Sequence, residues 1–324
     1  FGNGEKIIFD LGTGSMRNLN ALMIPTEYLT KIFISHLHTD HWGALASLWA
    51  GGWTAGRPVP LKIWGPSGMR PDMGTKYAVE HFLKAYNWDY QTRAFKISPI
   101  PGRIDVEEFD YKAVNQVVYD ENGIQIRSIP AIHAGDGPVS YIIEYAGLKL
   151  VFGGDSSPNK WFVEYAKNAD FAIHEAFGTP EFFVKDYGQP PQLAWRACCE
   201  FHTSGPAFGK IMSEIEPRHA VSYHSMEEAL DDIRAGIRET YDGPLSVAVD
   251  NMVWNITKDK IVERMIVSPD QAWSVNGPNK PPSPPAPGTV PDPISDFIKA
   301  GRWQPAEEAQ APMVDKFKKD NNLK

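Results

Sequence analysis

The sequence contains little cysteine. Cys198 and Cys199 are the only two among 324 residues, and they are adjacent in the chain. Neighbouring cysteines rarely form a disulfide with each other, and their spacing does not match a CxxC metal site. The sequence therefore excludes a disulfide framework and a thiolate zinc knuckle, and we expect both side chains to be small buried residues.

Long apolar runs are also missing. No stretch approaches the roughly 18 residues that a membrane-spanning helix needs, and no basic, apolar and small-residue pattern of a signal peptide is present. We therefore expect no membrane partner and favour a cytoplasmic location. The chain begins at Phe1 without a methionine, so a processed or omitted N-terminal segment stays open.

Basic residues are fewer than acidic ones. Lys and Arg number 32 against 40 Asp and Glu, which gives a formal net charge of −8. Binding to polyanions depends largely on Lys and Arg that displace counterions, so this balance disfavours non-specific nucleic-acid binding without excluding a local basic groove. Hydrophobic residues make up 42% and charged residues 22%, which is ordinary for a globular protein and excludes wholesale disorder.

Strand-like and helix-like patterns alternate along most of the chain. Strands are predicted at residues 6–10, 31–35, 61–64, 116–119, 124–128, 139–145, 148–152, 171–173, 219–223, 252–256 and 261–265. Helices are predicted at residues 43–50 and 74–86, with others between the later strands. Strand-rich blocks interleaved with helices indicate a layered α/β protein with sheets at its centre.

Proline is concentrated near the end. Residues 278–293 hold eight prolines in sixteen positions, too many for the interior of a strand or helix. We therefore predict one domain over residues 1–267. Residues 268–324 should form a proline-rich connector and a C-terminal helical extension, with helices near 294–301 and 307–319.

The histidines are the strongest chemical signal. His36, His38, Asp40 and His41 follow a predicted strand and precede a predicted helix. Side chains at i and i+2 of an extended segment point the same way, so His36 and His38 can share a metal ion. The turn into the helix brings Asp40 and His41 to a second point nearby. Imidazole and carboxylate are the ligands that zinc accepts when thiolates are absent, which favours a metal site over a merely polar turn.

This motif, His-Leu-His-Thr-Asp-His after an apolar strand, resembles the HxHxDH signature of the metallo-β-lactamase superfamily. These are αββα hydrolases with metals at one end of two facing sheets. His133, Asp155 and His224 match the remaining family ligands in the same order along the chain. The resemblance covers residues 6–265 and implies an α/β protein with the αββα four-layer sandwich.

The resemblance implies two zinc ions per chain. His36, His38 and His133 would hold one ion and Asp40, His41 and His224 the other, with Asp155 between them. Two divalent ions about 3.5–4 Å apart can share a water and lower its pKa from about 15.7 toward about 7. The implied enzyme is a metal-dependent hydrolase in which a metal-bridging hydroxide attacks a carbonyl or a phosphorus.

The departures from the family pattern narrow this interpretation. Flavodiiron relatives carry a glutamate where His38 stands, so the histidine favours hydrolysis over oxygen reduction. Lactamases with a cysteine ligand carry it where Asp155 stands, so that subclass is disfavoured. The family usually opens with a further strand before Lys6, and residues outside the given sequence could supply that sheet edge.

Two further elements resemble those of tRNase Z-type phosphodiesterases. His-Glu-Ala-Phe177 resembles their HEAT element with phenylalanine in place of threonine, and His202-Thr-Ser resembles their HST element with the last two residues exchanged. The resemblance implies that His202 acts on the leaving group and that Glu175 orients it, so we expect His202, Glu175 and Asp40 to be the catalytic residues. Glu175 could instead pair locally, and His202 could cap the helix that follows.

The overall likeness is to tRNase Z-like proteins and to environmental third-subclass metallo-β-lactamases related to them. It implies a phosphodiesterase or endonuclease acting on RNA, with β-lactam-hydrolysing activity, in a homo-oligomer. One alternative is a hydrolase of small β-lactams, lactones or esters without RNA activity. A non-catalytic scaffold is the second alternative, but such proteins typically lose metal ligands and all seven are present here.

Overall fold

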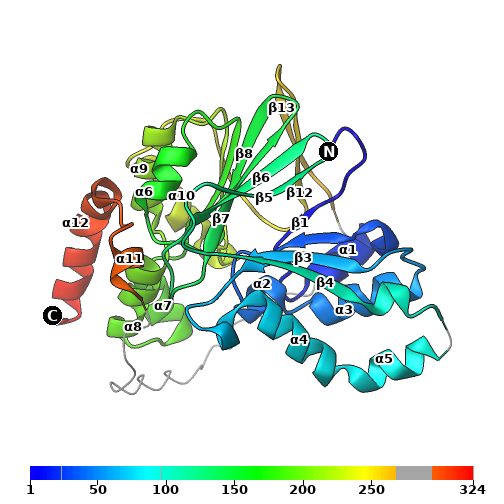
Figure 1. Cartoon of the computed structure of the whole chain (residues 1–324). Coiled ribbons are helices and arrows are strands. Elements are labelled where there is room, and N and C mark those ends of the chain that lie inside the picture. Colours follow the sequence, from blue (N-terminus) through cyan, green and yellow to red (C-terminus); the bar gives the residue numbers. More distant parts are fainter. Residues whose placement is uncertain (23, 96, 268–293, 324) are drawn as a thin grey trace.

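In the part of the chain that the structure describes, two large β-sheets form the centre of the protein, and a two-stranded sheet lies apart from them (Figure 1). The computed structural model describes residues 1–22, 24–95, 97–267 and 294–323. In the described residues, the first sheet is parallel and has the order β1 (Ile8–Phe9), β2 (Lys31–Phe33), β3 (Leu61–Pro66), β4 (Ile104–Phe109).

The second sheet has the order β11-β10-β9-β8-β7-β6-β5. Its strands are β5 (Gln116–Glu121), β6 (Ile124–Pro130), β7 (Val139–Tyr145), β8 (Leu148–Phe152), β9 (Phe171–Glu175), β10 (Ala220–Tyr223) and β11 (Leu245–Val247). Strands β5 to β8 are antiparallel neighbours, whereas β8 to β11 are parallel. A separate antiparallel pair consists of β12 (Met252–Ile256) and β13 (Ile261–Met265).

Helices cover the outer face of each large sheet (Figure 1). Beside the first sheet lie α1 (Ser15–Ala21), α2 (Thr39–Trp42), α3 (Leu45–Thr54), α4 (Thr75–Ala85) and α5 (Asn87–Ala94). Beside the second lie α6 (Lys160–Tyr165), α7 (Pro180–Tyr187), α8 (Pro191–Arg196), α9 (Gly205–Ile215) and α10 (Leu230–Arg238). The resulting order of helix, sheet, sheet and helix layers confirms the predicted αββα sandwich.

Aromatic side chains fill the space between the two large sheets. Phe33 and Trp64 of the first sheet stack with ring centroids 4.8 Å apart. Phe33 meets Tyr141 of the second sheet edge to face at 5.6 Å, and Trp64 meets Tyr119 in the same way at 5.4 Å. Edge-to-face and stacked rings are favourable arrangements in a buried layer. This layer holds the two sheets in one fixed relation, so the loops at their ends are also held relative to each other.

The two C-terminal helices pack against the second half of the molecule. Helices α11 (Asp296–Lys299) and α12 (Gln304–Asp320) confirm the predicted C-terminal helices, and α12 lies beside α9. Ile298 and Phe317 are buried in the same hydrophobic cluster as Phe208 of α9. The predicted proline-rich connector at residues 278–293 lies outside the described residues.

All eleven predicted strands are confirmed, but α1, β4, α5 and β11 were not expected. Strand β4 reads Ile-Asp-Val-Glu-Glu-Phe, and its acidic residues have low strand propensity. It lies at the edge of its sheet, where those carboxylates remain largely solvated. Helix α5 has no buried residue, and its Trp88 is exposed, so no apolar stripe indicated it.

The structure bears on the two cysteines and on the scarcity of long apolar runs. Cys198 and Cys199 are both buried and free, which confirms the expectation of buried thiols. Among the described residues, no helix has the length and apolar character that crossing a bilayer requires.

Candidate metal centre

The predicted ligands follow the carboxyl ends of strands from both large sheets. His36, His38 and His41 follow β2, whereas His133 follows β6, Asp155 follows β8 and His224 follows β10. Strands β6, β8 and β10 run in the same direction because two antiparallel steps separate β6 from β8 and the remaining steps are parallel. Their carboxyl ends therefore meet at one edge, the usual place for ligands in such sheets. The structure thus brings all seven predicted ligands together.

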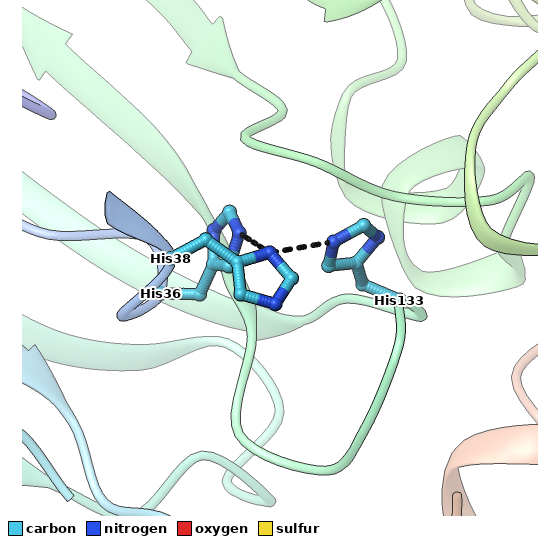
Figure 2. Close-up of side chains that lie close together, drawn as sticks. All are labelled: His36, His38 and His133. Carbon is cyan, nitrogen blue, oxygen red and sulfur yellow. Dashed lines mark hydrogen bonds between the residues drawn. The ribbon is translucent and has the colours of Figure 1, made fainter. Parts of the chain in front are cut away.

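Three imidazoles form the first cluster (Figure 2). His38 Nδ1 lies 3.0 Å from His36 Nε2 and 3.2 Å from His133 Nε2. Burial lowers the pKa of His133 to about 3 and that of His36 well below its ordinary value. Neutral imidazoles carry a nitrogen lone pair each, so three such nitrogens facing one point are suited to a shared cation.

Asp155 is the centre of the second cluster and also faces the first. Its carboxylate Oδ2 lies 3.2 Å from His41 Nε2 and 3.3 Å from His224 Nε2. The same oxygen lies 3.9 Å from His36 Nε2 and 3.8 Å from His133 Nε2. Because this side chain is only 1% exposed, its charge is directed at the surrounding imidazoles. The geometry places Asp155 between the two groups of histidines.

Asp40 completes the second cluster from the solvent side. Its Oδ2 lies 3.3 Å from His224 Nε2 and 3.4 Å from His41 Nε2, and its side chain is 60% exposed. Burial disfavours a charge on His41, but the bond to Asp10 and the nearby carboxylates of Asp155 and Asp40 outweigh it and raise the pKa of His41 to about 12. A cation would replace this proton, because metal binding to imidazole releases protons.

Unsatisfied polar atoms show that the residues present fit a metal. In the described part of the chain, His41 Nε2 and Asp155 Oδ1 are buried without a hydrogen-bond partner. Each such atom costs about 1–3 kcal/mol unless something pairs with it. His224 adopts the left-handed backbone conformation, with φ 61°, which is strained for a residue other than glycine. Five imidazoles, two carboxylates and local strain together indicate a site that could hold metal ions.

Asp10 supports the second cluster and was missed by the sequence analysis. His41 Nδ1 donates to Asp10 Oδ2 at 2.7 Å, which directs Nε2 toward Asp155. The Asp10 carboxylate also accepts from the backbone N–H and the hydroxyl of Ser35, each at 2.7 Å. A carboxylate behind a ligating histidine fixes its ring and raises its basicity. The sequence signal was only an aspartate at the end of the first strand.

Replacing Asp10 with alanine should weaken metal binding. His41 would lose the partner that fixes its ring, and such losses typically lower metal affinity about 10–100-fold. Competition with a chromophoric chelator would measure the affinity. Asp120, an exposed carboxylate on β5, offers the control variant Asp120→Ala. Equal affinities for the wild type and Asp10→Ala would contradict the supporting role.

A buried acid–imidazole pair adjoins the clusters. His202 Nδ1 lies 2.6 Å from Glu175 Oε2, and Glu175 Oε1 accepts from the backbone N–H of Ser156 at 2.6 Å. Burial, assisted by the charge of Asp155, raises the pKa of Glu175 well above its ordinary value. Burial lowers the pKa of His202 to about 4. Burial therefore opposes a charge on either group.

The bond between His202 and Glu175 shows that His202 does not cap the helix that follows it. His202 bonds to Glu175 rather than to the first turn of α9, whose N-cap residue is Ser204. Phe177, at the position where the HEAT element has threonine, stacks on the His202 ring with centroids 4.1 Å apart and planes at 11°. Glu175 therefore fixes one nitrogen of His202, and Phe177 fixes the plane of its ring.

A pocket of 440 Å³ opens over the clusters and His202. The described residues that line it include no lysine or arginine: His38, Asp40, His133, Ala134, Asp155, Phe177, Ala197, Phe201, His202, His224, Ser225 and Met226. A second pocket, of 430 Å³, shares His38 and His133 with the first and extends toward Pro66 and Met73. Substrate can therefore approach the imidazoles from two adjoining spaces.

Comparison with known proteins agrees with this geometry. The model of the metallo-beta-lactamase superfamily matches residues 1–177, and the chain belongs to this superfamily. Ribonuclease Z of Mycobacterium marinum is 25% identical over 205 residues, which cover 62% of this chain and 69% of that protein. Ribonuclease Z of Mycobacterium bovis (strain BCG / Pasteur 1173P2) is 28% identical over 205 residues, covering 62% and 68% respectively. These relatives confirm the resemblance to tRNase Z-like metallo-hydrolases.

Solved structures share the fold at lower sequence identity. The metallo-beta-lactamase fold protein YhfI from Bacillus subtilis matches with a TM-score of 0.56 and 17% identity, covering 81% of this chain and 89% of that one. The short form of human tRNase Z matches with a TM-score of 0.52 and 18% identity, covering 76% and 86%. Both likenesses support the αββα arrangement described above.

Proposed function

We propose that the protein is a di-zinc phosphodiesterase that cleaves RNA. The observation that carries this proposal is the His202–Glu175 pair, joined at 2.6 Å beside the histidine clusters, with His202 lining the pocket over them. A pair of this kind can protonate a basic leaving group, which phosphodiester cleavage requires. The relatives named ribonuclease Z support RNA as the substrate class.

The ligand assignment in this proposal follows the two clusters. We place His36, His38 and His133 on one zinc ion and Asp40, His41 and His224 on the other, with Asp155 shared. When bound, two such ions supply an activated water and stabilise charge that develops on oxygen. Asp40 is included among the catalytic residues because its carboxylate joins the second cluster and lines the pocket.

The proton donor in the proposal is His202. Glu175 holds its Nδ1 at 2.6 Å, which leaves Nε2 to present a hydrogen to the pocket. Phe177 covers one face of the ring and limits water on that side. As an alkoxide leaves, it takes the Nε2 hydrogen while the Glu175 carboxyl gives its proton to Nδ1, so His202 stays neutral and Glu175 becomes a carboxylate.

A second candidate function is hydrolysis of small β-lactams. Its support is the pocket lining, which includes no lysine or arginine among the described residues, together with the net charge of −8. Both features are unfavourable for a polyanion. The adjoining 430 Å³ pocket, lined in part by Pro66, Met73 and Pro138, offers apolar space for the substituents of a compact ring.

One parallel assay would separate these functions. The zinc-loaded protein would be given precursor tRNA with a 3′ trailer, bis(p-nitrophenyl) phosphate and a chromogenic cephalosporin. We expect cleavage of both phosphodiesters, with all activity lost in a His36→Ala control that lacks one ligand of the first cluster. Cephalosporin hydrolysis without either phosphodiester reaction would refute the main proposal and leave the second.

We also propose the domain division and assembly suggested by the sequence. Residues 1–267 would form the hydrolase domain and residues 268–324 the C-terminal extension, in a cytoplasmic homo-oligomer. Because Phe317 of α12 shares the hydrophobic cluster of the second sheet, the extension should depend on the domain for its structure. Sedimentation of the full chain would test the oligomer.

A further inference from the structure

The segment before His202 is an irregular turn that needs outside support. Residues Ala197–Phe201 form a single π-helical turn, and His202 follows directly. The last carbonyls of a helix have no partner within it, and π-turns are commonly found at functional sites. Here three successive carbonyls accept from side chains of other segments: Cys199 O from Gln310 Nε2 at 3.0 Å, Glu200 O from Arg302 Nη2 at 3.0 Å and Phe201 O from His133 Nδ1 at 2.8 Å.

Gln310 bonds to both sides of His202. It lies on α12 and is only 5% exposed. Besides its bond to Cys199, its Oε1 accepts from the Ser204 hydroxyl at 2.8 Å. Ser204 is the N-cap residue of α9, where a serine oxygen usually accepts from a helix N–H, yet it makes no such bond here. Its hydroxyl is directed instead to Gln310.

The position of α12 does not depend on Gln310 alone. Phe317, further along the helix, is 2% exposed and belongs to the hydrophobic cluster of the second sheet. At the start of the helix, the backbone N–H of Trp303 donates to Pro158 O at 3.1 Å. These contacts hold α12 against the core, so Gln310 is presented to the turn from a fixed support.

We propose that Gln310 is a positioning residue for His202. Glu175 fixes the Nδ1 atom of His202, and Phe177 fixes its ring plane. The backbone N–H of Phe177 also donates to Thr203 O at 2.9 Å, which holds the backbone on the carboxyl side of His202 only. By joining Cys199 O to the Ser204 hydroxyl, Gln310 fixes that backbone on both sides. The inference rests on the proposed function, in which His202 delivers the proton.

Small displacements at this point have large consequences for rate. A misplacement of about 1 Å in a reacting group can cost about 10²-fold in rate. His202 Nδ1 lies 3.8 Å from Asp155 Oδ2, and His202 lines the pocket. A shift of the turn would therefore change the direction of His202 Nε2 relative to the clusters. The expected effect therefore appears in kcat for substrates that need a proton, rather than in substrate binding.

The test uses Gln310→Met in the full-length, zinc-loaded protein. Methionine has a similar length and fills the space, but it cannot bond to both partners. We expect kcat for precursor tRNA to fall about 10- to 100-fold, because the acid is misplaced, with KM and zinc content unchanged. Bis(p-nitrophenyl) phosphate, whose leaving group needs little protonation, should lose less than about threefold, because a step without proton transfer gains little from an acid.

The matched control is Phe317→Leu on the same helix. It removes buried packing and should lower Tm, while the ratio of the two phosphodiester rates stays as in the wild type. Equal fractional losses on both substrates in Gln310→Met, or a changed ratio in Phe317→Leu, would show a structural effect and overturn the proposal. Ser204→Ala combined with Gln310→Met should lower kcat by less than the product of the single effects, because both substitutions remove the Ser204–Gln310 bond.

Hydrogen–deuterium exchange gives a result that does not depend on any substrate. Amides of residues 199–206 should exchange faster in Gln310→Met than in Phe317→Leu. Unchanged exchange there would overturn the positioning role, even if the wild type cleaves RNA. Faster exchange in a protein whose wild type cleaves no phosphodiester would support the positioning of His202 and refute only the proposed function.

Discussion

Replacement of Asp155 by alanine is expected to lower the metal content at both clusters and to remove nearly all turnover. Its Oδ2 lies within 3.9 Å of Nε2 atoms in both groups of histidines, so one substitution affects every neighbouring ligand. Mutating only a residue that supports a ligand costs about 10–100-fold. Loss of a carboxylate shared between clusters should exceed about 10²-fold in rate, measured beside zinc per chain by elemental analysis.

The control for this experiment is an aspartate next to the same sheet but away from the clusters. Asp170 bonds to Arg218 at 2.7 Å near the start of β9, so Asp170→Ala removes a comparable carboxylate. This control should retain its zinc and its turnover. Circular dichroism would establish that Asp155→Ala is folded, and a folded variant that keeps full zinc content would contradict the shared position of this carboxylate.

The second large effect concerns His202. His202→Ala should reduce cleavage of precursor tRNA about 10²–10⁴-fold, the usual contribution of general acid catalysis. The alkoxide that leaves from RNA is strongly basic and needs the proton. A chromogenic cephalosporin delocalises charge from the expelled nitrogen, so its hydrolysis should fall much less. Initial rates on both substrates, with zinc content unchanged, measure this asymmetry.

Two further variants make the His202 result specific. Glu175→Gln should also lower precursor-tRNA cleavage more than cephalosporin hydrolysis, but by a smaller factor than His202→Ala. The amide can still contact the His202 ring but cannot give it a proton. His219→Ala removes an imidazole that bonds to Ser246 and lies outside the clusters, and it should leave both rates unchanged. Equal losses on both substrates in His202→Ala would remove its leaving-group role.

The sequence predicted the parts of the site that depend on local geometry. His36, His38, Asp40 and His41 lie within one short segment, and alternation along a strand followed by a helical turn is enough to bring them together. The hydrophobic patterns of the strands likewise predicted a layered α/β protein, whereas the αββα order of its layers was implied by the resemblance. The more distant ligands came from the resemblance and not from the spacing of the residues.

The supporting contacts could not be predicted in this way. Asp10 reaches His41 because β1 and β2 pair in parallel, and a single aspartate at a strand end does not reveal that pairing. Gln310 is more than one hundred residues from Cys199 and Ser204, in a helix whose pattern shows only that one face is buried. Polar contacts between distant segments depend on tertiary packing, which hydrophobic periodicity does not encode.

The position of Gln310 in the chain also sets an order of events during synthesis. Ribosomes add about 5–20 residues per second, from the amino end. The seven predicted ligands, the last of which is His224, are therefore made several seconds before Gln310. A nascent chain could fold its ligand cluster while the segment carrying His202 still lacks its support. The ligand cluster and the support of His202 would then be completed at separate times during synthesis, with the support second.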